Sequence, residues 1–157
     1  MTLHADPLQS RIGEVLQEVV FPIERGKIRE FALASQNSSP IHFDVEAAAR
    51  AGFADIPAPL TFTVAMAFYA GGNATDLPLK LGLDLSRVVD GERSWTFHRK
   101  AIAGENLKVR TVLSEVSRRT NSAGREMRFI TLETTFADQS GVPVITEKGR
   151  MIELGRA

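Results

Sequence analysis

The chain has 157 residues, enough for one domain with a substantial core but not for several domains. Its 19 basic and 19 acidic residues cancel, so no basic excess points to nucleic acid or an anionic membrane as a partner. The lack of cysteine excludes disulfides, thiolate metal sites and a cysteine nucleophile.

Residues 1–10 form a polar lead-in without the basic segment and apolar run of a secretory signal, which predicts a cytoplasmic protein. The segment Glu18–Ile23 is rich in Val, Phe and Ile and predicts a strand. Pro22 lacks a backbone N–H and would confine that strand to the edge of a sheet.

Two short helices are predicted next. In Gly26–Ser35 the apolar residues recur at helical spacing and charged residues occupy the other side, which indicates an amphipathic helix. Residues 36–40 are dense in turn formers, and Asp44 can then cap a second helix that continues through Ala51 and ends at Gly52.

The segment Pro57–Gly72 predicts one helix with apolar side chains on every face, which the rest of the chain must enclose. Pro59 suits the first helical turn, where no N–H is needed, and Gly71 with Gly72 supplies the end. A helix of roughly 12 residues is too short for a bilayer, which requires about 20.

Four stretches with a β pattern follow, separated by turn-forming residues at 103–105, 121–124 and 138–141. These turns predict an antiparallel meander. The third stretch carries apolar residues on both faces, so we expect a helix to cover one face and a dimer partner the other. The stretches are Val88–Lys100, Asn106–Val116, Glu126–Ala137 and Val142–Leu154.

One strand before a buried helix and a meander after it predict a sheet curled around a single helix. We therefore expect one α+β domain with the hot-dog fold over residues 1–157. The pattern alone leaves another α+β sandwich open as the alternative.

Polar residues at 35–42 lie between the two short helices and close before the central helix, so we expect them to fold back toward its start. Asn37 and His42 are the candidate catalytic pair, because histidine carries protons near neutral pH and a nearby amide can hold a water. From the residues alone, a turn-stabilising Asn37 and a structural His42 remain the stronger interpretation.

The segment Ile28–Asp44 resembles the hydratase segment of MaoC-like dehydratases. The resemblance extends through Ala51–Phe53, Ile56–Phe62 and Phe97–Glu105, and so covers almost the whole chain. It is strongest to the N-terminal type of MaoC domain and to the A-type subunit of the (3R)-hydroxyacyl-ACP dehydratase. It implies a hot-dog fold and chemistry on acyl thioesters, with water added to a 2-enoyl chain or removed from an (R)-3-hydroxyacyl chain.

The family's catalytic motif has the pattern Asp-x-Asn-Pro-x-His. His42 and Pro40 match it, but Asn37 stands at the aspartate position and Ser39 at the asparagine position. An asparagine amide can hydrogen-bond a water but cannot take up its proton, so the resemblance implies that His42 is the only base in this chain.

The resemblance also places Pro59 where active members carry a glycine whose N–H polarises the thioester carbonyl. Proline has no N–H, so this donor is lost unless the amide of Leu60 or Thr61 replaces it. Residues of the central helix are then expected to line an acyl tunnel. The predicted substrate-binding residues are Pro59, Leu60, Thr61, Phe62 and Met66, with Phe68 beside them.

Three functions follow as hypotheses. The first is an acyl-thioester dehydratase or hydratase, acting as a homodimer through His42 or as the substrate-binding half of a heterodimer with a second MaoC-type subunit. The second is a noncatalytic module that binds acyl thioesters. The third is a thioesterase that uses Asp55. The expected partner molecule is an acyl-CoA or acyl-ACP, and no cofactor or metal is expected.

Overall fold

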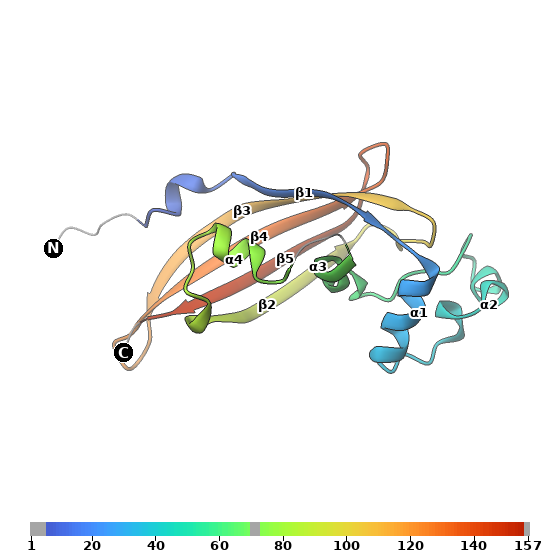
Figure 1. Cartoon of the computed structure of the whole chain (residues 1–157), viewed down its shortest axis with the longest axis horizontal. Coiled ribbons are helices and arrows are strands. Elements are labelled where there is room, and N and C mark those ends of the chain that lie inside the picture. The colour runs from blue at the N-terminus through green and yellow to red at the C-terminus, as the bar shows by residue number, and fades with distance from the viewer. Residues whose placement is uncertain (1–5, 70–72, 156–157) are drawn as a thin grey trace.

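The computed structural model describes residues 6–69 and 73–155. Five antiparallel strands form one curved sheet in the order β1-β3-β4-β5-β2. In Figure 1, α3 and α4 lie over one face of this sheet, while α1 and α2 lie beyond one of its ends. The strands are β1 Val15–Pro22, β2 Val88–Phe97, β3 Asn106–Thr120, β4 Glu126–Ala137 and β5 Pro143–Leu154.

The helices are short. The α-helices are α1 Arg25–Ala34, α2 Val45–Arg50, α3 Met66–Tyr69 and α4 Asp76–Lys80. The described elements also include short 3-10 helices. These are η1 Gln9–Arg11, η2 Pro40–His42, η3 Phe62–Ala65 and η4 Leu85–Arg87.

The first half of the chain follows its local signals. β1 is an edge strand and ends at Pro22, as predicted. Ile28 and Ala32 are fully buried on the apolar face of α1. The Asp44 carboxylate accepts hydrogen bonds from the backbone N–H groups of Glu46 and Ala47 at 2.7 and 3.1 Å, and so caps α2 as predicted.

The predicted meander is correct for three strands and wrong for β2. Strands β3, β4 and β5 are joined in sequence, but β2 pairs with β5 at the far edge of the sheet and not with β3. The reason lies in the segment that follows β2. Ile102 forms a bridge with Pro57, and the Gly104 N–H donates to the Ile23 carbonyl, so this segment crosses the end of the sheet and does not turn back as a hairpin.

The predicted central helix starts later than expected. Residues 57–60 are not helical: Pro57 pairs with Ile102, and the Ala58 N–H donates to the Ala101 carbonyl at 2.8 Å. The two prolines explain this, because a residue that precedes proline is pushed away from the helical region. The helical part comprises η3 and α3, which we call the central segment, and the predicted end at residues 71–72 lies outside the described residues.

The central segment is also not enclosed on every side. Phe62 is 2% exposed, whereas Phe68 is 76% exposed. The expectation of a helix buried on all faces was therefore wrong for this chain. The predicted curved antiparallel sheet with a helix against it is nevertheless present, although the described helical part is shorter than predicted.

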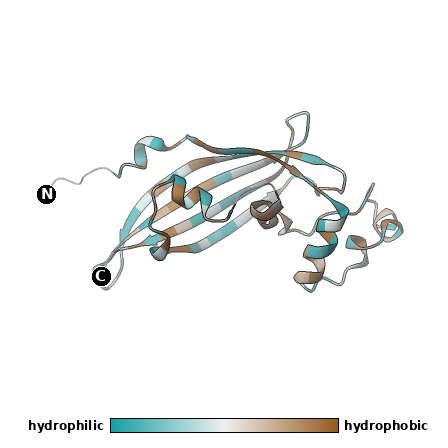
Figure 2. Ribbon diagram, in the orientation of Figure 1, coloured by the Kyte–Doolittle hydropathy of each residue, from teal (hydrophilic) through white to brown (hydrophobic). Residues whose placement is uncertain are grey.

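A row of polar side chains crosses the sheet and divides its core. Successive register partners on the five strands place Trp95, Glu147, Thr134, Thr111 and Gln17 side by side, and we call these five residues the polar row. Figure 2 shows hydrophobic and hydrophilic residues alternating along the strands. Two hydrophobic clusters flank the row, one built around Phe21, Phe62 and Phe136 and the other around Leu16, Leu113 and Leu132.

Two phenylalanines of the central segment give a matched test of this packing. Phe62 stacks on Phe21 at 5.5 Å between ring centroids and meets the edge of Phe31 at the same distance. We expect Phe62→Ala to lower the free energy of unfolding by about 3–5 kcal/mol, because it leaves a cavity in the core. Phe68→Ala should change it by less than about 0.5 kcal/mol. Urea denaturation of both variants measures the difference, and equal losses would contradict this packing.

Candidate functional site

His42 ends the turn η2 and is 5% exposed. Its Nδ1 lies 2.7 Å from the backbone carbonyl oxygen of Pro57. A carbonyl oxygen only accepts hydrogen bonds, so Nδ1 carries the proton in the neutral ring and Nε2 is left as an acceptor. The contact brings residues 35–42 against the start of the segment that leads into η3, as the sequence predicted.

Asn37 is built into the turn that ends α1. Gln36 has a positive φ of 54°, and the Asn37 N–H donates to the Ala32 carbonyl at 2.8 Å, which closes the helix end. The side-chain Oδ1 of Asn37 accepts the Ser39 N–H at 3.0 Å. In the part of the chain that the structure describes, no hydrogen bond joins the side chains of Asn37 and His42.

A narrow crevice lies beside the residues that lead into η3. Pro59, Leu60 and Phe62 line it, and its volume of about 10 Å³ is room for roughly one water. The backbone N–H groups of Leu60 and Thr61 donate no hydrogen bond to another described residue. They are therefore available to an incoming acceptor, whereas Pro59 has no N–H to offer.

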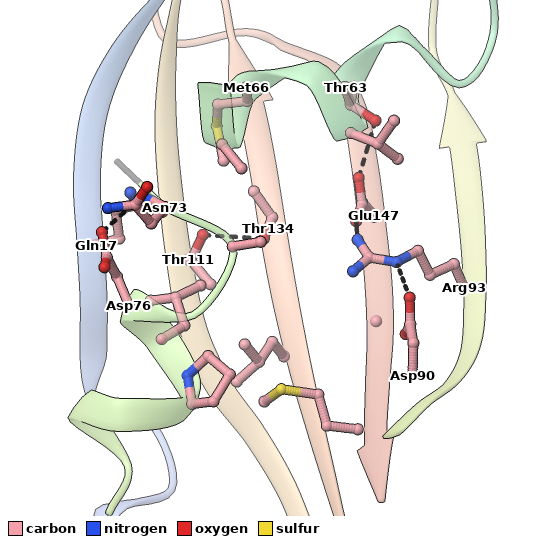
Figure 3. Close-up of a pocket in the computed structure, with 18 of the residues that line it drawn as sticks. Gln17, Thr63, Met66, Asn73, Asp76, Asp90, Arg93, Thr111, Thr134 and Glu147 are labelled. Carbon is pink, nitrogen blue, oxygen red and sulfur yellow. Dashed lines mark hydrogen bonds and ion pairs between the residues drawn. The ribbon is translucent and has the colours of Figure 1, made fainter. Parts of the chain in front are cut away.

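A larger cavity of about 180 Å³ lies between the central segment and the sheet. Met66 and Phe68 line it, whereas Phe62 points into the core beside Phe21. Thr63 borders both the crevice and the cavity. Figure 3 shows Met66 and Thr63 on the central segment, facing Thr134 and Glu147 on the sheet. Contact with a substrate stays a prediction for all five residues named for it, Pro59, Leu60, Thr61, Phe62 and Met66.

Glu147, which no sequence pattern singled out as functional, is the centre of the polar contacts in this cavity. It is 7% exposed. Its Oε2 accepts hydrogen bonds from Thr63 Oγ1 at 2.9 Å and from Trp95 Nε1 at 3.0 Å, and its Oε1 pairs with Arg93 Nη1 at 2.6 Å. Alternation along β5 carried the available signal, because it places this acid on the same face as the buried Ile145.

The guanidinium of Arg93 completes the network. It also donates to Asp90 Oδ2 at 3.0 Å. Burial lowers the pKa of Arg93, but the hydrogen bond to Asp90 and the charges of Glu147 and Asp90 raise it more, so the net shift is upward. The Arg93 side chain is therefore held in its charged form beside the cavity.

Asp55 serves the structure around the crevice. Both of its carboxylate oxygens accept from Arg25, at 2.9 and 2.5 Å, and Oδ1 also accepts the Ile56 N–H at 2.6 Å. The hydrogen bonds from Arg25 and then from Ile56 lower the pKa of this carboxyl. These contacts give Asp55 a structural role in the loop before Pro57, which speaks against its use as a hydrolytic base.

Across residues 6–69 and 73–155, no helix combines the length and the apolar run that a bilayer crossing needs. In the same ranges, no three or more His, Asp or Glu side chains gather in the geometry of a metal site.

A family model described as "FAS1-like, dehydratase domain region" matches residues 10–147. The chain belongs to this family. A UPF0336 protein from Saccharopolyspora erythraea is 37% identical over 150 residues, which cover 95% of this chain and 92% of that protein.

Solved structures place this FAS1-like dehydratase chain among the hot-dog proteins. It matches a MaoC-like dehydratase with a TM-score of 0.77 and 28% identity over 94% of its length, although it spans only 43% of that protein. It also matches the HadBC (3R-hydroxyacyl-ACP dehydratase) complex from Mycobacterium tuberculosis with a TM-score of 0.67 and 23% identity, covering 84% of this chain and 89% of that one. The predicted hot-dog fold and the resemblance to MaoC-like dehydratases are confirmed.

The Arg25–Asp55 pair predicts a pH-dependent contribution to stability. Asp55→Asn should lower the free energy of unfolding by about 0.5–1 kcal/mol at pH 7, because the pair is partly exposed. Since the pKa of Asp55 is lowered by folding, its contribution is complete above the unfolded pKa of about 3.9 and is lost as pH falls through the lower folded pKa.

Urea unfolding at several pH values measures this contribution. The curves of the wild type and Asp55→Asn should converge as pH falls below about 4. Glu46→Gln is the control, because the Glu46 side chain is 87% exposed and its pair with Arg50 is long at 3.7 Å. A difference between wild type and Asp55→Asn that persists unchanged at low pH would show that the ion pair is not its source.

Proposed function

We propose that this chain is the acyl-thioester-binding subunit of a hydratase or dehydratase for 2-enoyl and (R)-3-hydroxyacyl thioesters of coenzyme A or acyl carrier protein. In this proposal a second MaoC-type subunit supplies the complete Asp and His pair. The observation that carries it is the contact between His42 Nδ1 and the Pro57 carbonyl. This contact holds a histidine with a free Nε2 at the start of the segment that borders both the crevice and the cavity.

The chemistry explains why one subunit is insufficient. Addition of water to a 2-enoyl thioester requires a base that takes a proton from water and an acid that gives one to the α carbon. Nε2 of His42 can accept the proton from water. The Asn37 amide can do neither, and its oxygen is already bonded to the Ser39 N–H. This chain therefore offers one proton-transfer group where its family's motif has two.

Polarisation of the thioester carbonyl is weakened in the same way. The free N–H groups of Leu60 and Thr61 can donate to that oxygen, but Pro59 cannot. Loss of one such donor typically lowers the rate by about a hundred- to thousandfold. Residual hydration by this chain alone should therefore be slow and should depend on His42.

The comparisons support a role beside a partner. One of the solved structures of similar fold is itself named as a complex with 3R-hydroxyacyl-ACP dehydratase activity. The alternative is a noncatalytic module that binds acyl thioesters, which Asn37 and Pro59 favour equally because both remove catalytic groups without closing the cavity. A thioesterase is disfavoured, since Asp55 is held by Arg25.

Reconstitution tests the need for a partner. The purified chain is incubated with crotonyl-CoA, alone and with a MaoC-type protein that carries an intact Asp-x-Asn-Pro-x-His motif and is encoded nearby. The loss of enoyl absorbance should be at least about a hundredfold faster for the pair. Full activity of the chain alone that disappears in His42→Ala would show instead that the chain is a self-sufficient enzyme.

Restoring the missing groups distinguishes a subunit that has lost catalytic groups from a module built only for binding. We expect Asn37→Asp combined with Pro59→Gly to raise crotonyl-CoA hydration by the chain alone at least about tenfold, because it returns a second proton-transfer group and an N–H donor. Adding His42→Ala should abolish the gain. A folded double variant that binds acyl thioesters yet stays inactive would favour the noncatalytic module.

A further inference from the structure

The floor of the cavity is polar, which an acyl chain made only of methylenes does not require. Thr111, Thr134 and Glu147 of the polar row lie on this floor, with Gln17 at its margin. Apolar side chains border the floor on both sides. They include Met66 and Phe136 on one side and Leu132, Leu77 and Met151 on the other.

The two threonines leave a hydroxyl hydrogen for an occupant of the cavity. Thr111 and Thr134 are 0% and 9% exposed, and their Oγ1 atoms lie 2.9 Å apart. With Thr111 as the donor, the more exposed Thr134 hydroxyl keeps its own hydrogen, and no other described residue receives it. A buried O–H without an acceptor is unfavourable, so the site favours an occupant that can accept this hydrogen bond. Figure 3 shows the pair side by side on neighbouring strands beneath Met66.

The remaining polar groups of the cavity wall determine which ligand charge the cavity can accept. Glu147 already accepts hydrogen bonds from Thr63, Trp95 and Arg93. The cavity wall holds three acidic side chains, Asp76, Asp90 and Glu147, against the single guanidinium of Arg93. An anionic chain end would face this negative excess in a site of reduced dielectric, which disfavours it. The side-chain amide of Gln17 forms no hydrogen bond with another described residue, so it can donate a hydrogen bond to an uncharged ligand or accept one from it.

We propose that this cavity selects acyl chains that carry an uncharged oxygen function, a hydroxyl or a keto group, beyond the thioester end. The inference rests on the proposed function, which brings an acyl thioester to the crevice bordered by Thr63. Thr63 borders both the crevice and the cavity, and a volume of about 180 Å³ holds roughly six water-sized groups, so the cavity can take up a chain of about six carbons.

The single tryptophan of the chain gives a direct binding signal. Trp95 Nε1 donates to both Thr63 Oγ1 and Glu147 Oε2 at 3.0 Å, so its fluorescence reports on the cavity wall without any need for catalysis. The probes are N-acetylcysteamine thioesters with three chains of equal length: hexanoyl, 6-hydroxyhexanoyl and adipoyl. We expect the hydroxylated chain to bind about fivefold more tightly than hexanoyl, as for one added hydrogen bond. The anionic adipoyl chain should bind at least about tenfold more weakly than hexanoyl.

Removing the hydroxyl pair should remove the selectivity. In Thr111→Val with Thr134→Val, which keeps the side-chain shape, the hydroxylated chain should lose its advantage and hexanoyl should bind at least as tightly. Thr135→Val is the matched control, because Thr135 is the neighbour of Thr134 on β4 and does not line the cavity. Far-ultraviolet circular dichroism establishes that each variant is folded.

The outcomes separate the two proposals. Equal binding of hexanoyl and 6-hydroxyhexanoyl by the wild type would overturn the selectivity and leave acyl-thioester binding intact. A hydroxyl preference that survives in the double valine variant would overturn the role of the threonine pair. Absence of binding by all three thioesters would overturn this inference together with the proposed function. If the three thioesters bind with the expected order of affinities but the reconstituted pair hydrates no crotonyl-CoA, only the proposed hydratase or dehydratase reaction is overturned.

Discussion

The buried carboxylate of Glu147 is the contact on which the interior of this protein depends. It receives hydrogen bonds from Thr63 on the central segment and Trp95 on β2, and an ion pair from Arg93. A charge with so little exposure needs all of these partners, because an unpaired buried carboxylate is strongly unfavourable. The central segment also needs Glu147, since two consecutive helical turns of four residues each are too short to be stable alone. This mutual dependence sets the position of the crevice and of the cavity.

The two departures from the family's catalytic pattern cost the fold little. An aspartate at position 37 would accept the Ser39 N–H just as Asn37 does, so the turn after α1 is compatible with either residue. Pro59 fits an extended stretch whose neighbour Ala58 pairs with Ala101. Both residues satisfy the backbone around them while removing a proton carrier or a donor. Both residues are therefore compatible with the fold around His42.

The sequence allowed prediction of the features whose signals are local. Asp44 caps the helix it precedes, and turn residues join β3, β4 and β5. The central segment begins only at Phe62, later than the local signal of Pro59 predicts, because Pro57 and Pro59 each restrict the residue before them. The approach of His42 to Pro57 could be inferred from their order in the chain. The role of Glu147 could not be inferred, because its partners are distant in sequence. Its partners Trp95 and Arg93 come near it only through the register of β5 with β2.

The position of β2 has a consequence for how the molecule opens. No residue of β2 is fully buried, and β5 is its only neighbour among the described strands, with a sequence separation of 52 from Trp95 to Glu147. Segments with little burial open locally at a lower free energy than the strands of the core. Detachment of β2 would expose Glu147 and open one wall of the cavity while β3, β4 and β5 stay paired. β2 is thus the strand whose loss would uncover this carboxylate, because its residues Trp95 and Arg93 contact Glu147.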